Sequence, residues 1–231
     1  MNPGAENNCI VNEFRSFLQS ETFPCLAAKS ALKKEQIEFM VVDHMACPKD
    51  DISILNFLYS FVDIYRSSND YYHSAAIIFK EPLIFSEEMF DQLLWKRLQA
   101  LSDLDSKSYQ YDKRVEPNPA SVKFSFSLKE EAFFVIGLHN CSNRPARQFK
   151  YPVLIFNPHQ QFEHLRETHH FEKMQAAIRE REMTYTGSIN PMLDDFGNSS
   201  EVFQYSGRKY DSKWACPLII NHERPENNST A

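Results

Sequence analysis

Residues 132–138 read AFFVIGL, and this stretch decides the fold class. Because it is apolar on both faces, it predicts a strand that lies centrally in a sheet. A second apolar run, VLIFN at 153–157, predicts another strand. Upstream, SVKFSFSL at 121–128 alternates apolar and polar residues, and this pattern is typical of a strand with one face in water.

The rest of the chain adds two strands and several helices. Strands are expected at IEFMVVDH (37–44) and HSAAIIF (73–79), and helical spacing covers 9–20, 24–34, 50–66 and 86–105. The longest helix is expected over 158–182, with Asn157 as N-cap and Pro158 as its first residue. We therefore expect one α+β domain over 1–231, a mainly antiparallel sheet with helices packed on it, and frayed ends near 1–8 and 223–231.

Composition and charge narrow the class of partner. The 231 residues are 42% hydrophobic and 13% aromatic, which is ample for a buried core. A formal charge of −6 argues against nucleic acid as the main partner, because a phosphate-binding surface normally needs a basic excess. No apolar run approaches a membrane span, and the amino end has no signal-like pattern. We expect a cytoplasmic protein whose partners are small molecules or proteins, with a homodimer as an open option.

The five cysteines are odd in number and widely spaced, without a CxxC pair. Neither a disulfide framework nor a thiolate zinc site is indicated, so reduced thiols are expected. The usual nucleotide-binding, metalloprotease and hydrolase motifs are missing. With only five glycines, the chain can hardly build a backbone cradle for nucleotide phosphates.

Candidate functional groups lie at the ends of the predicted elements. Cys25 falls at the start of a predicted helix, where unpaired N–H groups and the positive end of the dipole favour a thiolate. It is a candidate iron ligand or nucleophile, and the alternative is a small buried hydrophobe. His139 ends the strand at 132–138 and precedes a turn with Arg144 and Arg147, whose guanidinium groups suit carboxylates. The alternative for both arginines is plain surface charge.

His159 is predicted in the first turn of the long helix, where the dipole keeps imidazole neutral and able to bind metal or polarise oxygen. A capping role is the alternative. His164, His169 and His170 lack the i, i+4 spacing of a helical metal pair, and we expect them on the surface.

Four blocks of the sequence resemble the YqcI/YcgG family, which includes the haem-dependent guanidino N-hydroxylase of guanitoxin biosynthesis. The blocks are FPCLAAKSAL (23–32), FFVIGLHNCSNRPARQFKYPVLIFNPHQQFEHLR (133–166), IREREMTYTGSINPMLDDFGNSSEVFQYSGR (178–208) and WACP (214–217). The resemblance implies a b-type haem with its iron, and oxygen-dependent hydroxylation of a guanidine or other amine nitrogen on a small amino-acid-like metabolite. Molecular oxygen and an electron donor are then partners as well.

The resemblance assigns roles to the candidate residues. Cys25 is our first choice of iron ligand, because an electron-donating thiolate favours oxygen cleavage, while His139 and His159 remain alternatives or line the distal side. Arg144 and Arg147 would hold haem propionates or a substrate carboxylate, and we expect their removal to leave the apo-protein stable. The sequence SINPMLDDFGNSSE at 188–201 predicts an irregular segment. A guanidinium substrate would pair with one of its acidic residues, namely Asp194, Asp195 or Glu201.

Two other functions stay open. One is a non-catalytic haem or small-ligand binding or sensing protein that uses the same residues. The other is an enzyme without haem in which Cys25 is the nucleophile and His139 or His159 is the base.

Overall fold

The computed structural model of the chain describes residues 3–21, 23–68, 70, 72–167, 180, 183 and 199–222. In this part, one sheet holds five strands in the order β1-β2-β5-β4-β3. Their bounds are β1 Ile37–His44, β2 Ser74–Glu81, β3 Phe126–Leu128, β4 Glu131–Leu138 and β5 Val153–Pro158. β1 and β2 are parallel, and the other three pairings are antiparallel. The expected α+β class with a mainly antiparallel sheet is confirmed.

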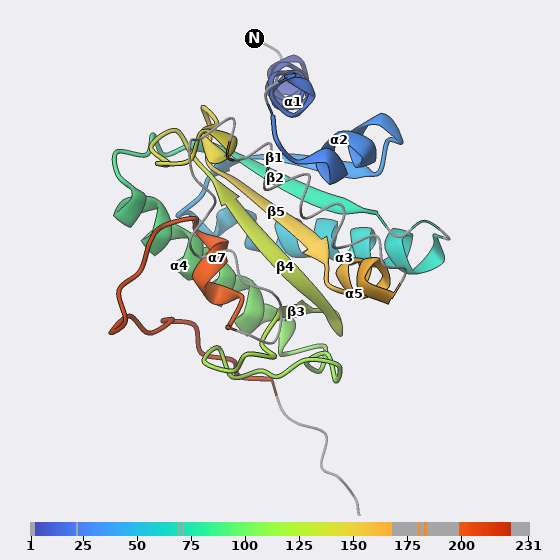
Figure 1. Cartoon of the computed structure of the whole chain (residues 1–231), viewed down its shortest axis with the longest axis vertical. Coiled ribbons are helices and arrows are strands. Elements are labelled where there is room, and N and C mark those ends of the chain that lie inside the picture. The colour runs from blue at the N-terminus through green and yellow to red at the C-terminus, as the bar shows by residue number, and fades with distance from the viewer. Residues whose placement is uncertain are drawn as a thin grey trace, which may run out of the picture.

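Helices cover both faces of this sheet (Figure 1). The described helices are α1 Pro3–Gln19, α2 Leu26–Lys33, α3 Asp51–Ser67, α4 Glu87–Asp105, α5 Gln160–Glu167 and α7 Val202–Tyr205, with short 3-10 turns at Pro48–Asp50 and Pro145–Arg147. α3 makes the crossover between the parallel strands β1 and β2, as parallel pairing requires.

The larger core lies between the sheet and helices α3 and α4, which lie behind the sheet in Figure 1. Alternate residues of the strands, such as Ile77 and Val135, face Leu58 and Leu94 from these helices. At Gly137 the sheet and α4 approach so closely that an added Cβ would lie 2.5 Å from a ring carbon of Phe90.

A second core lies on the opposite face of the sheet. Ala76, Ile78 and Val153 from the strands pack there with Phe14 and Leu18 from α1. The division of alternate strand residues between two cores is why the strands carry apolar residues on both faces. The sheet is therefore the middle of three layers.

Two expectations about the strands were partly wrong. The strand predicted at 121–128 is regular only over Phe126–Leu128, and Ser125 and Ser127 are buried rather than in water. Their hydroxyls are satisfied inside the protein, since Ser127 Oγ accepts from the N–H of Asp112 at 3.0 Å and Ser125 Oγ donates to a carboxylate oxygen of Glu201 at 2.8 Å. β4 lies inside the sheet as expected, although β5 is the middle strand.

The predicted start of the long helix was also wrong. Pro158 ends β5, and α5 begins at Gln160. Asn157 does not cap a helix, because its side chain accepts a hydrogen bond from Ser74 Oγ and donates one to the carbonyl of Phe134. Most of the predicted helix beyond Glu167 lies outside the described residues.

Candidate functional site

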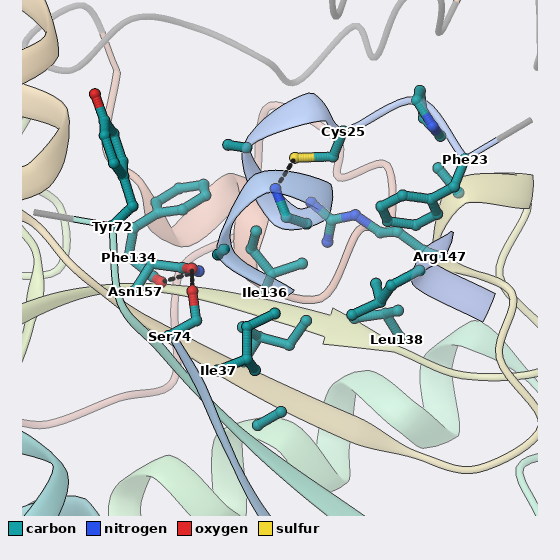
Figure 2. Close-up of a pocket in the computed structure, with 18 of the residues that line it drawn as sticks. Phe23, Cys25, Ile37, Tyr72, Ser74, Phe134, Ile136, Leu138, Arg147 and Asn157 are labelled. Atoms are coloured by element: carbon teal, nitrogen blue, oxygen red, sulfur yellow. Dashed lines mark hydrogen bonds between the residues drawn. The ribbon is translucent and has the colours of Figure 1, made fainter. Parts of the chain in front are cut away.

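A partly open cavity of about 260 Å³ lies between the outer face of the sheet and helices α1 and α2 (Figure 2). Its floor consists of strand residues, among them Ile37, Ala76, Ile136 and Ile155. α1 and α2 supply apolar walls that include Phe14 and Ala28. The result is a mostly apolar space with a few polar groups, which is the usual character of a small-molecule site.

Cys25 lines this cavity at the N-terminus of α2. It is the N-cap residue, and its Sγ accepts a hydrogen bond from the N–H of Ala28 at 3.5 Å. Pro24 therefore stands just before the N-cap, although the helix was expected over 24–34. The sulfur is held where helix N–H groups and the positive dipole end favour negative charge.

Arg144 and Arg147 line the same cavity from the turn after β4. Arg144 is 9% exposed, so it is not a plain surface charge. Arg147 Nη1 donates to the carbonyls of Gln204 at 2.8 Å and Tyr205 at 3.2 Å, at the end of α7. Arg147 thus has a structural role as well, contrary to our expectation that its removal would leave the apo-protein stable.

Neutral polar groups gather toward the other end of the cavity. Figure 2 shows Ser74 and Asn157 on that side, and Cys25 and Arg147 on the opposite side. Gln161 from α5 also lines the cavity there. Among the described residues that line the cavity there are two arginines and no carboxylate, so its fixed charge is positive.

His139 does not line the cavity, because it faces the other side of the sheet. Its ring stacks on Phe90 of α4, with centroids 4.2 Å apart, and Nδ1 is buried without a hydrogen-bond partner among the described residues. Burial, and after it the positive charge of Arg147, lowers the pKa of His139 to about 4. A neutral imidazole among apolar neighbours here is a core residue.

His159 is also absent from the cavity lining. It lies between β5 and α5, where its Nδ1 is 3.2 Å from Oε1 of Glu201. Ser125 Oγ donates to the other carboxylate oxygen of Glu201 at 2.8 Å. All three side chains are buried, so Glu201, which the sequence offered for a guanidinium substrate, is already paired inside the protein.

The structure therefore brings together three of the predicted site residues, namely Cys25, Arg144 and Arg147. A thiol nucleophile with a histidine base is not assembled, because neither His139 nor His159 lines the cavity. Asp194, Asp195, His169 and His170 lie outside the described residues.

Sequence reasoning missed the neutral end of the cavity. Ser74 and Asn157 lie on adjacent strands and face the same side, and their side chains are hydrogen-bonded at 2.7 Å. A polar residue within an otherwise apolar strand, as Asn157 is in VLIFN, was the available signal. We interpreted it as a helix cap instead.

A haem can be tested against this cavity by its donor groups and its size. One thiol at a helix N-terminus, two arginines and an apolar floor match the needs of an iron, two propionates and a macrocycle. The volume of about 260 Å³ is just below the roughly 300 to 1,000 Å³ of typical cofactor pockets. The donor set fits haem, and the macrocycle would have to extend past this partly open space.

Two features of the described residues bear on cofactors and membranes. None of the described helices combines the length and the apolar character that crossing a bilayer demands. No group of three or more His, Cys, Asp or Glu side chains in the same residues is arranged to hold a bare metal ion. A haem needs only an axial side chain, so its requirements differ from those of such a cluster.

The fold and the cavity define an α/β/α layered protein with a mostly apolar cavity that one thiol and two arginines line. Residues 14–219 match the model of the YqcI/YcgG family, and the chain belongs to that family. It is similar to two proteins of Bacillus subtilis (strain 168): "Uncharacterized protein YqcI" is 27% identical over 207 residues, which are 85% of this chain and 80% of that protein. "Uncharacterized protein YcgG" is 24% identical over 211 residues, 86% of this chain and 81% of that protein. No solved structure matches.

Proposed function

We propose that this protein is a haem-dependent monooxygenase that hydroxylates a guanidine or amine nitrogen of a small amino-acid-like metabolite. The observation that carries the proposal is that Cys25, Arg144 and Arg147, distant in sequence, line one apolar cavity. The resemblance of the sequence blocks to a family with a haem-dependent N-hydroxylase supplies the class of chemistry.

The side chains of the cavity have separate tasks in this proposal. Haem, when bound, would supply the activation of molecular oxygen. Cys25 would ligate the iron, since its sulfur is already fixed by the N–H of Ala28. Arg144 and Arg147 would bind propionates, and the hydrogen bonds of Arg147 to α7 hold its guanidinium in place beforehand. The apolar floor would exclude water from the reacting nitrogen.

A cationic substrate requires a negative partner. Glu201 is paired with His159 and Ser125, so we assign this task to Asp194 or Asp195. A bidentate pair between guanidinium and carboxylate would orient the nitrogen as well as neutralise it.

The test is single-turnover hydroxylation by the hemin-reconstituted protein in air with a chemical electron donor. Arginine and simple alkylguanidines are the first substrates, and mass spectrometry detects the addition of one oxygen atom. Hydroxylated product that depends on hemin, oxygen and donor is the expected result. Tight hemin binding without product from any guanidine or amine would contradict the proposal.

A second candidate is a non-catalytic protein that binds haem or another small anion. The observation in its favour is that the described residues of the cavity include two arginines and no carboxylate. Such a protein would bind ligand and return it unchanged in the turnover experiment.

A further inference from the structure

A series of aromatic rings connects the cavity to the surface. Phe134 lines the cavity, and its ring centroid lies 5.9 Å from that of Tyr205. Tyr205 stacks with Trp95 at 6.0 Å, and Trp95 lies 5.8 Å from Trp214. Trp214 in turn stacks on Tyr210 at 3.7 Å. These five rings, which we call the aromatic relay, come from β4, α4, α7 and the segment after α7.

Burial differs along the relay. Tyr205 is fully buried, Trp95 is 4% exposed and Tyr210 is 8% exposed. Trp214 is half-buried and follows the exposed Lys213. The relay therefore crosses the protein interior from the half-buried Phe134 at the cavity to the half-buried Trp214.

Each oxidisable ring in the interior has a carboxylate beside it. The hydroxyl of Tyr205 is 3.3 Å from Oε2 of Glu201. The hydroxyl of Tyr210 donates to Asp91, and Trp95 Nε1 donates to the same carboxylate at 2.8 Å. Burial, followed by the nearby carboxylates, raises the pKa of both tyrosines, so their phenols are protonated at rest.

Packing alone does not require this arrangement, since phenylalanine would fill a core without burying a hydroxyl and a carboxylate together. Tryptophan and tyrosine are the side chains that lose one electron most readily. An oxidised phenol is strongly acidic, so tyrosine oxidation in a protein interior needs a proton acceptor within hydrogen-bond reach. Glu201 and Asp91 provide one for each tyrosine.

We propose that the aromatic relay carries single electrons from the surface at Trp214 to the cavity. This inference rests on the proposed function for its oxidant, a one-electron oxidant formed from haem and a peroxide or oxygen. Tyr205 loses one electron to the oxidant and its phenolic proton to Glu201. Trp95 then reduces the Tyr205 radical, and the proton returns from Glu201.

The outer half of the relay completes the transfer. Trp214, with Tyr210 beside it, reduces Trp95, and any proton lost by Tyr210 moves to Asp91. A soluble one-electron reductant of the ascorbate class restores the outer ring. The net change is one electron from that reductant to the oxidant in the cavity, while every protein group regains its original state.

The first experiment uses hemin-loaded protein, hydrogen peroxide and rapid-freeze EPR. The parent should give an aromatic radical and should oxidise ascorbate, and both should be lost in Trp95→Phe and Tyr205→Phe. Tyr59→Phe is the matched control, because Tyr59 also donates to a carboxylate, Asp105, at 2.7 Å but has its ring contact with Tyr109 outside the relay. The same radical and the same ascorbate oxidation in all variants would overturn the proposal.

Trp214→Phe repeats the test at the half-buried end, where folding is least at risk. It should leave hemin binding unchanged and should lower ascorbate oxidation. An undiminished rate in this variant would also overturn the relay.

A second experiment tests the aromatic relay without haem. If the protein binds no hemin, the proposed function fails. The aromatic relay is then tested with a ruthenium photo-oxidant attached to Cys25, in a protein whose other four cysteines are replaced by serine. Flash excitation with an external quencher should give a tryptophan radical that Trp95→Phe and Trp214→Phe abolish. A radical that persists in both variants would contradict the relay whatever the protein's function.

Discussion

Nη1 of Arg147 lies 2.8 Å from the carbonyl oxygen of Gln204, while the same side chain lines the cavity. One guanidinium group thus ties the end of α7 to the turn that follows β4 and also faces the candidate ligand. Stability and binding are linked through this residue.

Arg147→Ala should lower the free energy of unfolding of the apo-protein by about 1 to 3 kcal/mol, because two carbonyls lose a charged donor. Urea denaturation measures the change. Arg147→Lys should recover part of the charge interaction but lose the planar fork. An apo-protein as stable as the parent in both variants would show that these hydrogen bonds contribute nothing.

Hemin affinity should fall roughly tenfold or more in Arg144→Ala, because a haem propionate loses its partly desolvated arginine partner. Spectroscopic titration of the apo-protein gives the dissociation constant. Lys150→Ala is the matched control, since Lys150 is an exposed cation on the same segment and does not line the cavity. Equal losses in the two variants would point to general electrostatic attraction rather than a site.

Substitution of Cys25 separates helix capping from iron ligation. Cys25→Ala should cost up to about 1 kcal/mol of stability through the lost cap, whereas Cys25→Ser keeps an oxygen acceptor for the N–H of Ala28. Both variants should lose the thiolate-type absorption of the ferrous carbon monoxide adduct. A parental spectrum in both variants would remove Cys25 as the iron ligand.

The buried His139 predicts a pH dependence of stability. Its pKa is lowered to about 4, so the folded protein takes up this proton at lower pH than the unfolded chain, whose histidine has a pKa of about 6.5. Above about pH 6.5 this histidine does not lower the free energy of unfolding, because it is neutral in both states. As the pH falls from there toward 4, the unfolded chain takes up the proton first, and the free energy of unfolding decreases by up to about 3 kcal/mol. His139→Phe, which keeps a ring against Phe90, should flatten the stability curve in that window. Parallel curves for parent and variant would contradict the assignment.

Gly207 should not tolerate a side chain. It has φ of +81°, and an added Cβ would lie 2.8 Å from Cδ of Arg147. Gly207→Ala should therefore destabilise the protein by about 1 to 3 kcal/mol, from backbone strain and from displacement of the arginine. Thermal denaturation of the variant measures this loss of stability. A melting temperature equal to that of the parent would show that the turn rearranges freely.

The sheet could be predicted from the sequence where strand patterns are local. IEFMVVDH gave the exact bounds of β1, and the apolar stretch AFFVIGL identified an interior strand, because two buried faces need a continuous apolar run. Ser125 and Ser127 were placed in water because their partners, such as Asp112 and Glu201, are distant in sequence. A tertiary hydrogen bond of this kind leaves no periodic signal.

The candidate site was predictable only where a residue has a local sequence signal. Cys25 has a local signal, a position at the start of a helix, and the structure confirms it as the N-cap. His139 and His159 were chosen as polar residues at element ends, but the side of the sheet that each faces depends on the strand register and on α7. The cavity itself, formed by α1, α2 and the sheet, is a product of long-range packing.

Titration of the purified apo-protein with hemin, followed by ultraviolet-visible absorption, tests most directly whether this cavity binds haem. We expect saturable one-to-one binding with a sharp Soret band that is weakened in Arg144→Ala and altered in Cys25→Ala. A titration that shows only the broad absorption of free hemin would contradict the assignment of this cavity to haem.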